Sequence, residues 1–360
     1  MEDDKGNSVS FVGKQIGFGG EGDIYRTNQS GIVAKIYKNL PTQDQINKLN
    51  VMIANPPKNP STYGSYGNHI SIAWPNSLLT KDGKCIGFLM PEIARNVGII
   101  NVYNPKRRKQ VLPKFDWIFL HITAFNFVEI VGSLHKQKYI IGDIKPQNIL
   151  VNNQAAVSIV DADSFQVKNG STVYRCRVAS EGFTPPELIG SRTSNITQTI
   201  YHDRYRVALI IYHLLFARHP FEEGSWCNGE EKELEELMKG GIWLYNNSQN
   251  DRQPNKNTIP FQTIHPKLQQ LFKQCFNDGH NNPIERPSTQ DWSDALKLAI
   301  EDLAYCSKVD NHNYSEIYGR CYWCERANTM KDIFAGEPPK NQKSKIKITS
   351  TPISRRLPSP

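Results

Sequence analysis

Residues 140–151 read IIGDIKPQNILV, and residues 157–163 read VSIVDAD. The polar residues within these mainly apolar runs include Asp143, Lys145, Asn148 and Asp161. An aspartate can orient a hydroxyl and accept its proton, and carboxylate and amide oxygens are ligands for hard divalent cations. Asp, Pro and Asn are also common in turns for backbone reasons, so the hexamer DIKPQN alone is compatible with a surface turn before a strand. A chemical role therefore requires further parts of the same pattern elsewhere in the chain.

A glycine-rich segment, IGFGGEGDIY, occupies residues 16–25. Its glycines show the spacing G-x-G-x-x-G, at Gly17, Gly19 and Gly22. The same spacing marks dinucleotide-binding loops, but those loops open a helix. Here β-branched residues alternate over residues 23–26 and 31–37, which predicts that the loop lies between strands. Lys35 falls in the second of these segments, where a lysine is alternatively an exposed edge residue.

Four more fragments follow in order: GFTPPE at 182–187, an apolar stretch at 207–216 after Asp203, HPF at 219–221 and ERPS at 285–288. Each fragment alone is explained as a helix start, a helix end or a turn. Their common order is that of the eukaryotic-type protein kinases, which the chain resembles over residues 11–300. In that family the motifs HRDLxxxN, DFG and APE stand at the places of IGDIKPQN, DAD and PPE.

The chain resembles one bacterial branch of these kinases more narrowly. The similar segments are AWP at 73–75, GFLMP at 87–91, IVDADSFQ at 159–166 and FTPPEL at 183–188. Members of the branch tend to be encoded beside a metal-dependent Ser/Thr phosphatase and a von Willebrand A-type protein. The resemblance implies these two as partners, besides a protein substrate.

The resemblance implies an α+β, two-lobed protein-kinase-like fold, with a small β-rich N-lobe, a larger helical C-lobe and a small C-terminal zinc-binding module. We expect the N-lobe and hinge at residues 11–92, the C-lobe at 93–300, a Cys/His zinc knuckle at 301–335 and a basic tail at 336–360. The tail is rich in Pro, Ser, Thr and Lys and has little apolar content. This composition predicts disorder.

The resemblance also implies chemical roles, with ATP as the phosphoryl donor and Mg²⁺ or Mn²⁺ as the metal. Asp143 would orient the acceptor hydroxyl, Lys145 and Lys35 would neutralise phosphate, and Asn148 and Asp161 would hold the metal. Charge explains this set, because the transferred phosphoryl group needs positioning and electrostatic stabilisation more than covalent help.

The nucleotide pocket would combine the glycines of the loop with apolar residues over adenine and a hinge whose backbone pairs with the base near Pro91 to Ile93. Its expected members are Gly17, Gly19, Gly22, Ile24, Val33 and Glu92. The resemblance implies that a hydroxyl at Ser180 holds Asp143 and Lys145 together. Lys145 and this hydroxyl both favour serine or threonine as the acceptor. Glu187 and Arg286 would form the buried ion pair that ties the activation segment to the C-lobe.

Two departures from the kinase pattern concern the catalytic loop, here residues 141–148, and the metal loop, here residues 161–163. Ile141 and Gly142 replace His-Arg, so the arginine that clamps a phosphorylated activation loop is missing. Ala162 and Asp163 replace the Phe and Gly of DFG. Asp163 is expected either to add a carboxylate near the metal or to be a solvated loop residue.

A third departure concerns the partner of Lys35. The helix expected at residues 43–54 should carry a pairing Glu, but no Glu occurs between Ile36 and Pro91. We expect Lys35 to contact Asp161 or an unusual acid, with Glu21 as the alternative. Two functions remain: an active ATP- and Mg-dependent protein serine/threonine kinase, and a nucleotide-binding pseudokinase scaffold that recruits partners. The retained acids, Asn148 and Lys35 favour the enzyme.

Seven cysteines and no signal peptide favour reduced thiols in a cytoplasmic protein. Cys321 and Cys324 form a C-x-x-C pair, which is alternatively a redox pair. With Cys306 and His312 nearby, they would complete the four ligands of a structural Zn²⁺. His280 or a water is the alternative to His312.

The chain has 360 residues, of which 38% are hydrophobic and 22% charged, as is ordinary for a globular protein. The formal net charge is +8, but residues 336–360 hold six basic residues against one acidic residue. The remainder is nearly neutral, which argues against nucleic-acid binding. The apolar run Val207–Ala217 is too short to span a bilayer, so no membrane segment is expected.

Overall fold

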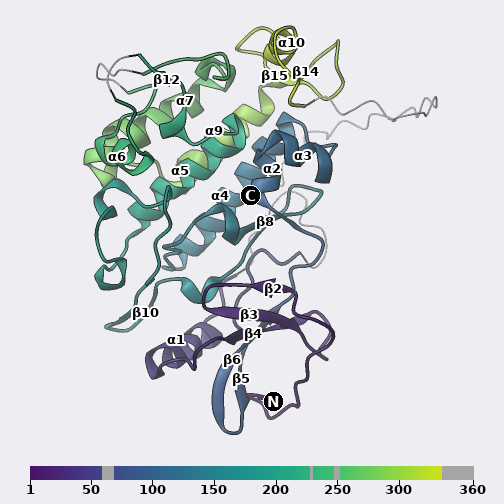
Figure 1. The fold of residues 1–360 in the computed structure, drawn as a ribbon, viewed down its shortest axis with the longest axis vertical. Coiled ribbons are helices and arrows are strands. Elements are labelled where there is room, and N and C mark those ends of the chain that lie inside the picture. Colours follow the sequence, from purple (N-terminus) through teal and green to yellow (C-terminus); the bar gives the residue numbers. More distant parts are fainter. Residues whose placement is uncertain (59–68, 228–229, 247–251, 335–360) are drawn as a thin grey trace, which may run out of the picture.

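The computed structural model describes residues 1–58, 69–227, 230–246 and 252–334. These residues form a β-rich lobe, a helical lobe and a small module at the far end of the helical lobe (Figure 1). The expected α+β, two-lobed fold is confirmed. The predicted tail at 336–360 lies outside the described residues.

The N-lobe is an antiparallel sheet with the strand order β1-β5-β6-β4-β3-β2 in the described part of the chain. Its strands are β1 (Glu2–Asp3), β2 (Gly17–Phe18), β3 (Gly22–Arg26), β4 (Ile32–Tyr37), β5 (Ser77–Lys81) and β6 (Lys84–Pro91). The glycine loop joins β2 to β3, as its β-branched flanks predict. In register, Lys35 of β4 lies between Ile24 of β3 and Phe88 of β6.

Helix α1 (Gln43–Ala54) packs against β5 and begins at a capping box, in which Thr42 and Gln45 bond each other's backbone N–H groups. Its buried side chains are Lys48, Leu49 and Met52. The inner face of the helix therefore carries a cation where the kinase pattern has an acid. The helix packs against the hairpin of β10 (Val167–Asn169) and β11 (Thr172–Tyr174), which belongs to the activation segment, here residues 161–187.

The C-lobe and the C-terminal module hold the other described elements. The helices are α2 (Ile99–Tyr103), α3 (Pro105–Val111), α4 (Trp117–Lys136), α5 (Ile200–Phe216), α6 (Leu234–Gly240), α7 (Pro266–Lys273), α8 (Gly279–Asn281), α9 (Thr289–Glu301) and α10 (Tyr322–Ala327). The strands are β7 (Val97–Gly98), β8 (Ile149–Val151), β9 (Val157–Ile159), β10 (Val167–Asn169), β11 (Thr172–Tyr174), β12 (Ser225–Trp226), β13 (Arg252–Gln253), β14 (Leu303–Tyr305) and β15 (Asn313–Ser315).

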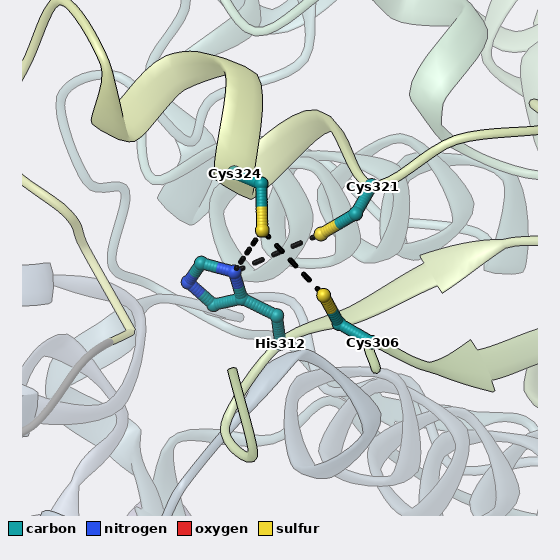
Figure 2. Close-up of side chains that lie close together, drawn as sticks. All are labelled: Cys306, His312, Cys321 and Cys324. Carbon is teal, nitrogen blue, oxygen red and sulfur yellow. Dashed lines mark hydrogen bonds between the residues drawn. The ribbon is translucent and has the colours of Figure 1, made fainter. Parts of the chain in front are cut away.

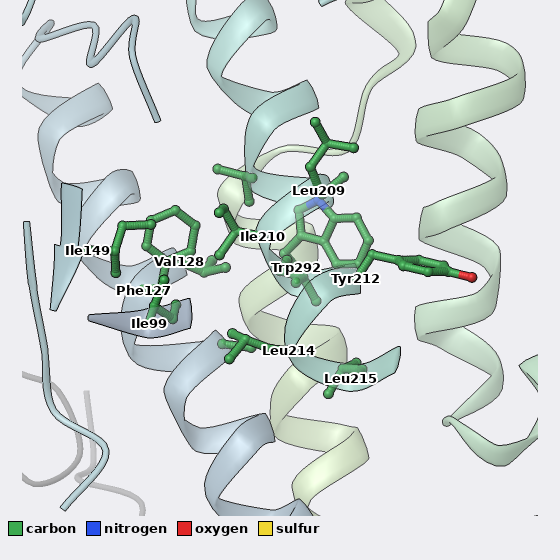
Figure 3. Packing of buried hydrophobic residues seen from close by; sticks show 14 of the residues in the cluster. Ile99, Phe127, Val128, Ile149, Leu209, Ile210, Tyr212, Leu214, Leu215 and Trp292 are labelled. Atoms are coloured by element: carbon green, nitrogen blue, oxygen red, sulfur yellow. The ribbon is translucent and has the colours of Figure 1, made fainter. Parts of the chain in front are cut away.

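Helix α4 is the centre of the C-lobe core, where it packs against α5 and α9. Figure 3 shows Phe127 of α4 beside Ile149 of β8, with Ile210 of α5 and Trp292 of α9 in the same apolar cluster. Among the described helices, α4 alone is long and apolar enough to cross a membrane, yet 78% of that segment is buried within the protein. Its apolar side chains therefore serve the core.

The C-terminal module docks on the beginning of α4. The Trp323 ring of α10 lies edge-on to the Trp117 ring, with 5.0 Å between the ring centroids, and to the Phe334 ring at 4.7 Å. The amide side chain of Asn313 accepts a hydrogen bond from the Ile118 N–H at 3.4 Å. Because Trp323 is almost fully buried, the module and the C-lobe share one packed interface.

Candidate active site and metal centre

A cavity of about 1160 Å³ lies between the lobes. Its walls include every candidate residue for nucleotide binding and transfer: Gly17, Gly19, Gly22, Ile24, Val33, Lys35, Glu92, Asp143, Lys145, Asn148 and Asp161. The cavity exceeds the usual range for small-ligand pockets. It has room for a nucleotide, a metal ion and part of an acceptor chain.

The glycine loop folds tightly over the end of β4. The Gly19 N–H donates to the Gly22 carbonyl at 2.9 Å. A Cβ at Gly22 would lie 2.5 Å from the Ile36 carbonyl oxygen, a distance that side chains do not reach. Glycine at position 22 therefore lets the loop approach β4 closely, where its backbone can face the phosphates of a nucleotide.

The catalytic loop holds Asp143 in a network of three partners. Lys145 Nζ lies 2.6 Å from Asp143 Oδ2, and the Ser180 hydroxyl donates to Asp143 Oδ1 at 2.7 Å. The Asn148 side-chain N–H donates to the Asp143 backbone carbonyl at 3.1 Å. The predicted contact of the Ser180 hydroxyl with Asp143 is confirmed. Asp143 is nearly inaccessible to solvent, so its carboxylate is fixed in one orientation before a substrate arrives.

Asp203 fixes the backbone of the catalytic loop, a role that the sequence did not reveal. Its fully buried carboxylate accepts from the Ile141 N–H at 2.8 Å, the Gly142 N–H at 2.9 Å and His135 Nε2 at 3.1 Å. Burial opposes its charge, but the contacts with His135 and the charge of Arg206 outweigh burial and lower the pKa of Asp203. The available signal was the single acid of α5, which precedes the apolar stretch at 207–216.

Lys35 is held by two carboxylates of the metal loop. Lys35 Nζ lies 2.6 Å from Asp161 Oδ1, and 2.7 and 2.8 Å from the two oxygens of Asp163. The expected contact with Asp161 is confirmed. The expectation of a solvated Asp163 was wrong, because its carboxylate is buried and bound to Lys35. Asp163 is thus an unusual acid of the kind that Lys35 was expected to contact. The ion-pair partners of Lys35 among the described residues thus do not include Glu21.

Charge complementarity keeps both buried lysines of this cluster in place. Burial opposes the charge of Lys35, but the carboxylates of Asp163 and Asp161 outweigh burial and raise the pKa of Lys35. Lys48 donates to the Asp163 backbone carbonyl at 2.7 Å. Burial lowers the pKa of Lys48, and the charge of Asp163 offsets part of this effect. Two lysines and two aspartates therefore balance one another at the back of the cleft.

Asp161 and Asn148 have the donor atoms that a hard cation requires. Asp161 has a left-handed backbone, with φ 64° and ψ 36°, and its carbonyl accepts from the Ser164 hydroxyl at 2.8 Å. Its side chain keeps 37% of its surface exposed, and both residues line the cavity. A carboxylate and an amide oxygen fit Mg²⁺ or Mn²⁺, and strained backbone of this kind is typical of functional loops.

At the hinge, the polar groups of Glu92 bond to the N-lobe. Its carboxylate pairs with Arg26 Nε at 2.8 Å, and its N–H donates to the Gly31 carbonyl at 2.8 Å. Glu92 still lines the cavity together with Pro91 and Ile93. Its side chain therefore braces the hinge against β3 instead of pointing at a base.

The activation segment is anchored at its C-terminal end and at Cys176. Arg286 donates to the two oxygens of Glu187 at 2.8 Å each, which confirms the predicted ion pair. This bidentate geometry is the strong form of such a pair. Nearer the catalytic loop, Cys176 is buried against Gly142, whose φ is +74°.

Three cysteines and a histidine converge in the C-terminal module, as Figure 2 shows. The Sγ atoms of Cys306 and Cys324 are 3.5 Å apart, and His312 Nδ1 lies 3.4 Å from Cys324 Sγ and 3.7 Å from Cys321 Sγ. All four donor atoms lie within 4.8 Å of one another. Such a Cys₃His group suits a tetrahedral zinc ion. The fourth donor is His312, and neither His280 nor a disulfide takes part.

A carboxylate supports the histidine of this group. Asp332 Oδ2 lies 2.8 Å from His312 Nε2, on the ring edge opposite the cysteines. The same residue contacts the C-lobe, because its backbone carbonyl accepts from Lys109 of α3. Carboxylates in this position orient a histidine ligand and select its tautomer. Asp332 was missed from the sequence, since it lies outside the Cys/His pattern.

The chain was compared with known families and proteins. Residues 103–296 match the family described as "Protein kinase domain". The chain is 30% identical over 329 residues to protein kinase YegI of Escherichia coli O157:H7, covering 88% of this chain and 49% of YegI. It is 29% identical over 333 residues to YegI of Escherichia coli strain K12, covering 89% and 49%. Over 116 residues it is 27% identical to the serine/threonine-protein kinase Nek3 of Mus musculus, covering 31% of this chain and 22% of Nek3. The chain spans about half the length of the YegI proteins.

Proposed function

The chain belongs to the protein kinase family, and we propose that it is an active, ATP- and Mg²⁺-dependent kinase that phosphorylates serine or threonine hydroxyls of a protein substrate. The observation that carries this proposal is the assembled catalytic loop. Asp143 is bonded to Lys145 and Ser180 with distances of 2.6 and 2.7 Å. A scaffold that only binds nucleotide has no need for a buried, oriented base beside a cation.

In the proposed reaction, Asp143 accepts a hydrogen bond from the substrate hydroxyl and aims its oxygen at the γ-phosphorus. As the new P–O bond forms, the hydroxyl proton passes to Asp143, and the bond between phosphorus and the ADP oxygen breaks. Lys145 lies beside Asp143 and offsets negative charge on the transferred group. A Mg²⁺ ion, when bound, would neutralise charge on the phosphate oxygens.

The nucleotide site follows from the walls of the cavity. Lys35 would bind phosphate oxygens, and the glycine loop would cover them. Asn148 and Asp161 would hold the metal. Ile24 and Val33 would pack against adenine, and the backbone of the hinge at Pro91 to Ile93 would pair with its edge. The bonds of Glu92 to Arg26 and Gly31 favour Pro91 and Ile93 over Glu92 as the backbone partners.

Regulation by an arginine-bound activation-loop phosphate is not part of the proposal. Gly142 offers no guanidinium, and Cys176 fills the adjoining space. The activation segment is instead held by packing, by the Glu187–Arg286 pair and by Lys48 at the Asp163 carbonyl. We propose that the loop is catalytically competent without phosphorylation.

We propose that the Cys₃His group binds one structural Zn²⁺, since four protein ligands leave no open position for a reactive water. Its free thiols support a reducing, cytoplasmic location for this part of the protein.

A metal-dependent Ser/Thr phosphatase and a von Willebrand A-type protein are the proposed partners, on the family resemblance alone. Residues 11–92, 93–300 and 301–335 remain the proposed units, although strand β1 extends the N-lobe sheet to residue 2.

One assay separates the enzyme from the scaffold. Purified protein is incubated with γ-labelled ATP, Mg²⁺ and a generic Ser/Thr acceptor, and compared with Asp143→Ala. Label on the acceptor or on the chain with wild type only supports the kinase. Tight Mg–ATP binding without transfer by wild type would favour the pseudokinase scaffold.

A further inference from the structure

We propose that Asp163 takes over the task of the absent helix glutamate and positions Lys35 for the phosphates of the nucleotide. Asp163 would be a positioning residue, because it touches Lys35 and not the substrate. The inference rests on the proposed nucleotide site and deepens it. It also explains how a kinase sequence without a glutamate in helix α1 can keep its strand lysine in place.

The geometry favours Asp163 over Asp161 for this task. Both oxygens of Asp163 contact Lys35 Nζ, at 2.7 and 2.8 Å, whereas Asp161 uses one oxygen at 2.6 Å. The Asp163 side chain is 3% exposed and that of Asp161 is 37% exposed. A buried pair with both oxygens engaged is stronger and better oriented than a half-exposed contact.

The two carboxylates therefore have different roles once metal and nucleotide are bound. Asp161 faces the cavity, where a metal ion would draw its oxygens away from Lys35. Asp163 lies behind Lys35 and also accepts a hydrogen bond from the Tyr37 hydroxyl at 3.0 Å. These contacts use three of the about four acceptor positions of its carboxylate, and the side chain is only 3% exposed, so Asp163 is less suited than Asp161 to bind a metal. Asp163 can thus hold the lysine while Asp161 holds the metal.

Helix α1 contributes a cation to this arrangement. The buried Lys48 of α1 donates to the backbone carbonyl of Asp163 at 2.7 Å. In the usual kinase arrangement the helix gives an acid to the strand lysine. Here the metal loop gives the acid, and the helix lysine holds the loop. The position of Lys35 consequently depends on the metal loop first and on the helix second.

The first test measures the coupling between the two side chains in the nucleotide-free protein. Melting temperatures are compared for wild type, Lys35→Met, Asp163→Asn and the double variant. Asp163→Asn should lower the melting temperature in the wild-type background, and by less than half as much when Lys35 is already Met, because residues that act through each other are not additive. Equal shifts in both backgrounds would overturn the proposed pairing.

The second test measures Mg–ATP affinity by calorimetry with the same four proteins. Asp163→Asn should weaken binding about tenfold and raise the Mg²⁺ concentration required, because Asp161 must then serve both Lys35 and the metal. In the Lys35→Met background, the same change should alter affinity less than twofold. Tyr37→Phe is the matched control, since it removes a hydrogen bond to Asp163 but no charge, and it should change affinity less than twofold.

The outcomes separate this inference from the proposed kinase activity. Affinity of Asp163→Asn within twofold of wild type, or a tenfold loss that persists with Lys35→Met, would overturn the positioning role. Both readouts concern folding and binding. Wild-type protein that shows the predicted coupling but transfers no phosphate would therefore refute the proposed activity and leave the role of Asp163 intact.

Discussion

Cys176 occupies the space that a side chain at Gly142 would need. A Cβ at position 142 would lie 2.6 Å from the Cys176 Cβ and 2.8 Å from its Sγ. The residue that the kinase pattern reserves for a phosphate-binding arginine is thus in direct contact with the activation segment. The segment is packed on the catalytic loop by van der Waals contact, where other kinases use a charged clamp.

This packing predicts activity without loop phosphorylation. Ser171, Thr172 and Tyr174 are the hydroxyl residues of the β10–β11 hairpin region, and the first two are exposed. Replacing them together by Ala, Val and Phe should change the transfer rate less than about twofold, as is usual for surface changes away from buried features. The rate is measured with labelled ATP on phosphatase-treated protein. A large loss of activity with an unchanged melting temperature would reveal a different phosphate clamp.

The same contact predicts that Gly142→Ala destabilises the protein. The new methyl group meets Cys176, and a φ of +74° is unfavourable for alanine. Gly170→Ala is a matched control, because Gly170 has φ +57° but no atom within 4 Å of its Cβ position. Urea unfolding should show a loss of about 1 kcal/mol for the control and about 2–4 kcal/mol for Gly142→Ala. Equal losses of unfolding free energy in the two variants would mean that the catalytic loop accommodates the added methyl group beside Cys176 without strain.

The two acids of the site should separate binding from transfer. Asp143→Asn removes the group that accepts the hydroxyl proton, so the transfer rate should fall about 100- to 10,000-fold with Mg–ATP affinity nearly unchanged. Asp161→Ala removes the proposed metal ligand and should abolish Mg²⁺-dependent binding of ATP. Calorimetry and the labelled-ATP assay measure the two properties. Equal loss of affinity in both variants would contradict this division of roles.

Metal analysis should find about one zinc per chain. Cys306→Ser should lower both the zinc content and the melting temperature, because a structural site contributes its binding free energy to folding. Cys227→Ser is the control, since Cys227 is an exposed free thiol outside the Cys₃His group. Purified protein without zinc, or with a Cys321–Cys324 disulfide, would refute the structural site.

Acid should destabilise the fold through His219. Burial lowers the pKa of His219 to about 4, below the ordinary value of about 6.5. Its Nε2–H donates to the Gly182 carbonyl at 2.9 Å, and its Nδ1 accepts from the Phe221 N–H at 3.3 Å. A proton on Nδ1 would break the second bond. The neutral ring therefore satisfies both partners.

The sign of the pH effect follows from this depressed pKa. As the pH falls from about 6.5 to about 4, the unfolded chain binds the proton before the folded one, so stability is lost in this window and is fully present above it. The contribution of one such histidine to the slope is about 1.4 kcal/mol per pH unit. His219→Gln should reduce the slope of unfolding free energy against pH by about one proton. An unchanged slope would show that His219 titrates normally in the folded protein.

Local motifs made the fold and much of the site predictable from the sequence. The GDIKPQN and DAD segments placed Asp143, Asn148 and Asp161, and the C-x-x-C pair located the Cys₃His group. The pairing of Lys35 with Asp163 itself was not predictable, because the usual pattern has glycine at position 163. The kinase pattern therefore assigns no role to an acid at position 163.

Interrupted patterns account for the other omissions. The apolar run of α4 is broken by His121, Asn126 and Glu129, so this helix was not recognised from the sequence. In the fold, the buried amide of Asn126 is satisfied by donating to the Ala155 carbonyl at 2.7 Å. Asp203 accepts hydrogen bonds from backbone N–H groups of the catalytic loop, and Asp332 bonds to Nε2 of His312. Contacts of this kind leave little trace in residue spacing.

Helix α4 contacts both the C-terminal module and the residue that holds the catalytic loop. Its first turn meets Trp323 and Asn313 of the C-terminal module, and His135 in its last turn contacts Asp203, which holds the catalytic loop. Twenty residues of helix form a rod of about 30 Å. The amide hydrogens of Ile141 and Gly142 should therefore exchange with solvent more readily when the Cys₃His group is emptied, although no ligand of the metal lies near them. Hydrogen exchange at these two amides would report, across the length of the lobe, on the state of the distant metal centre.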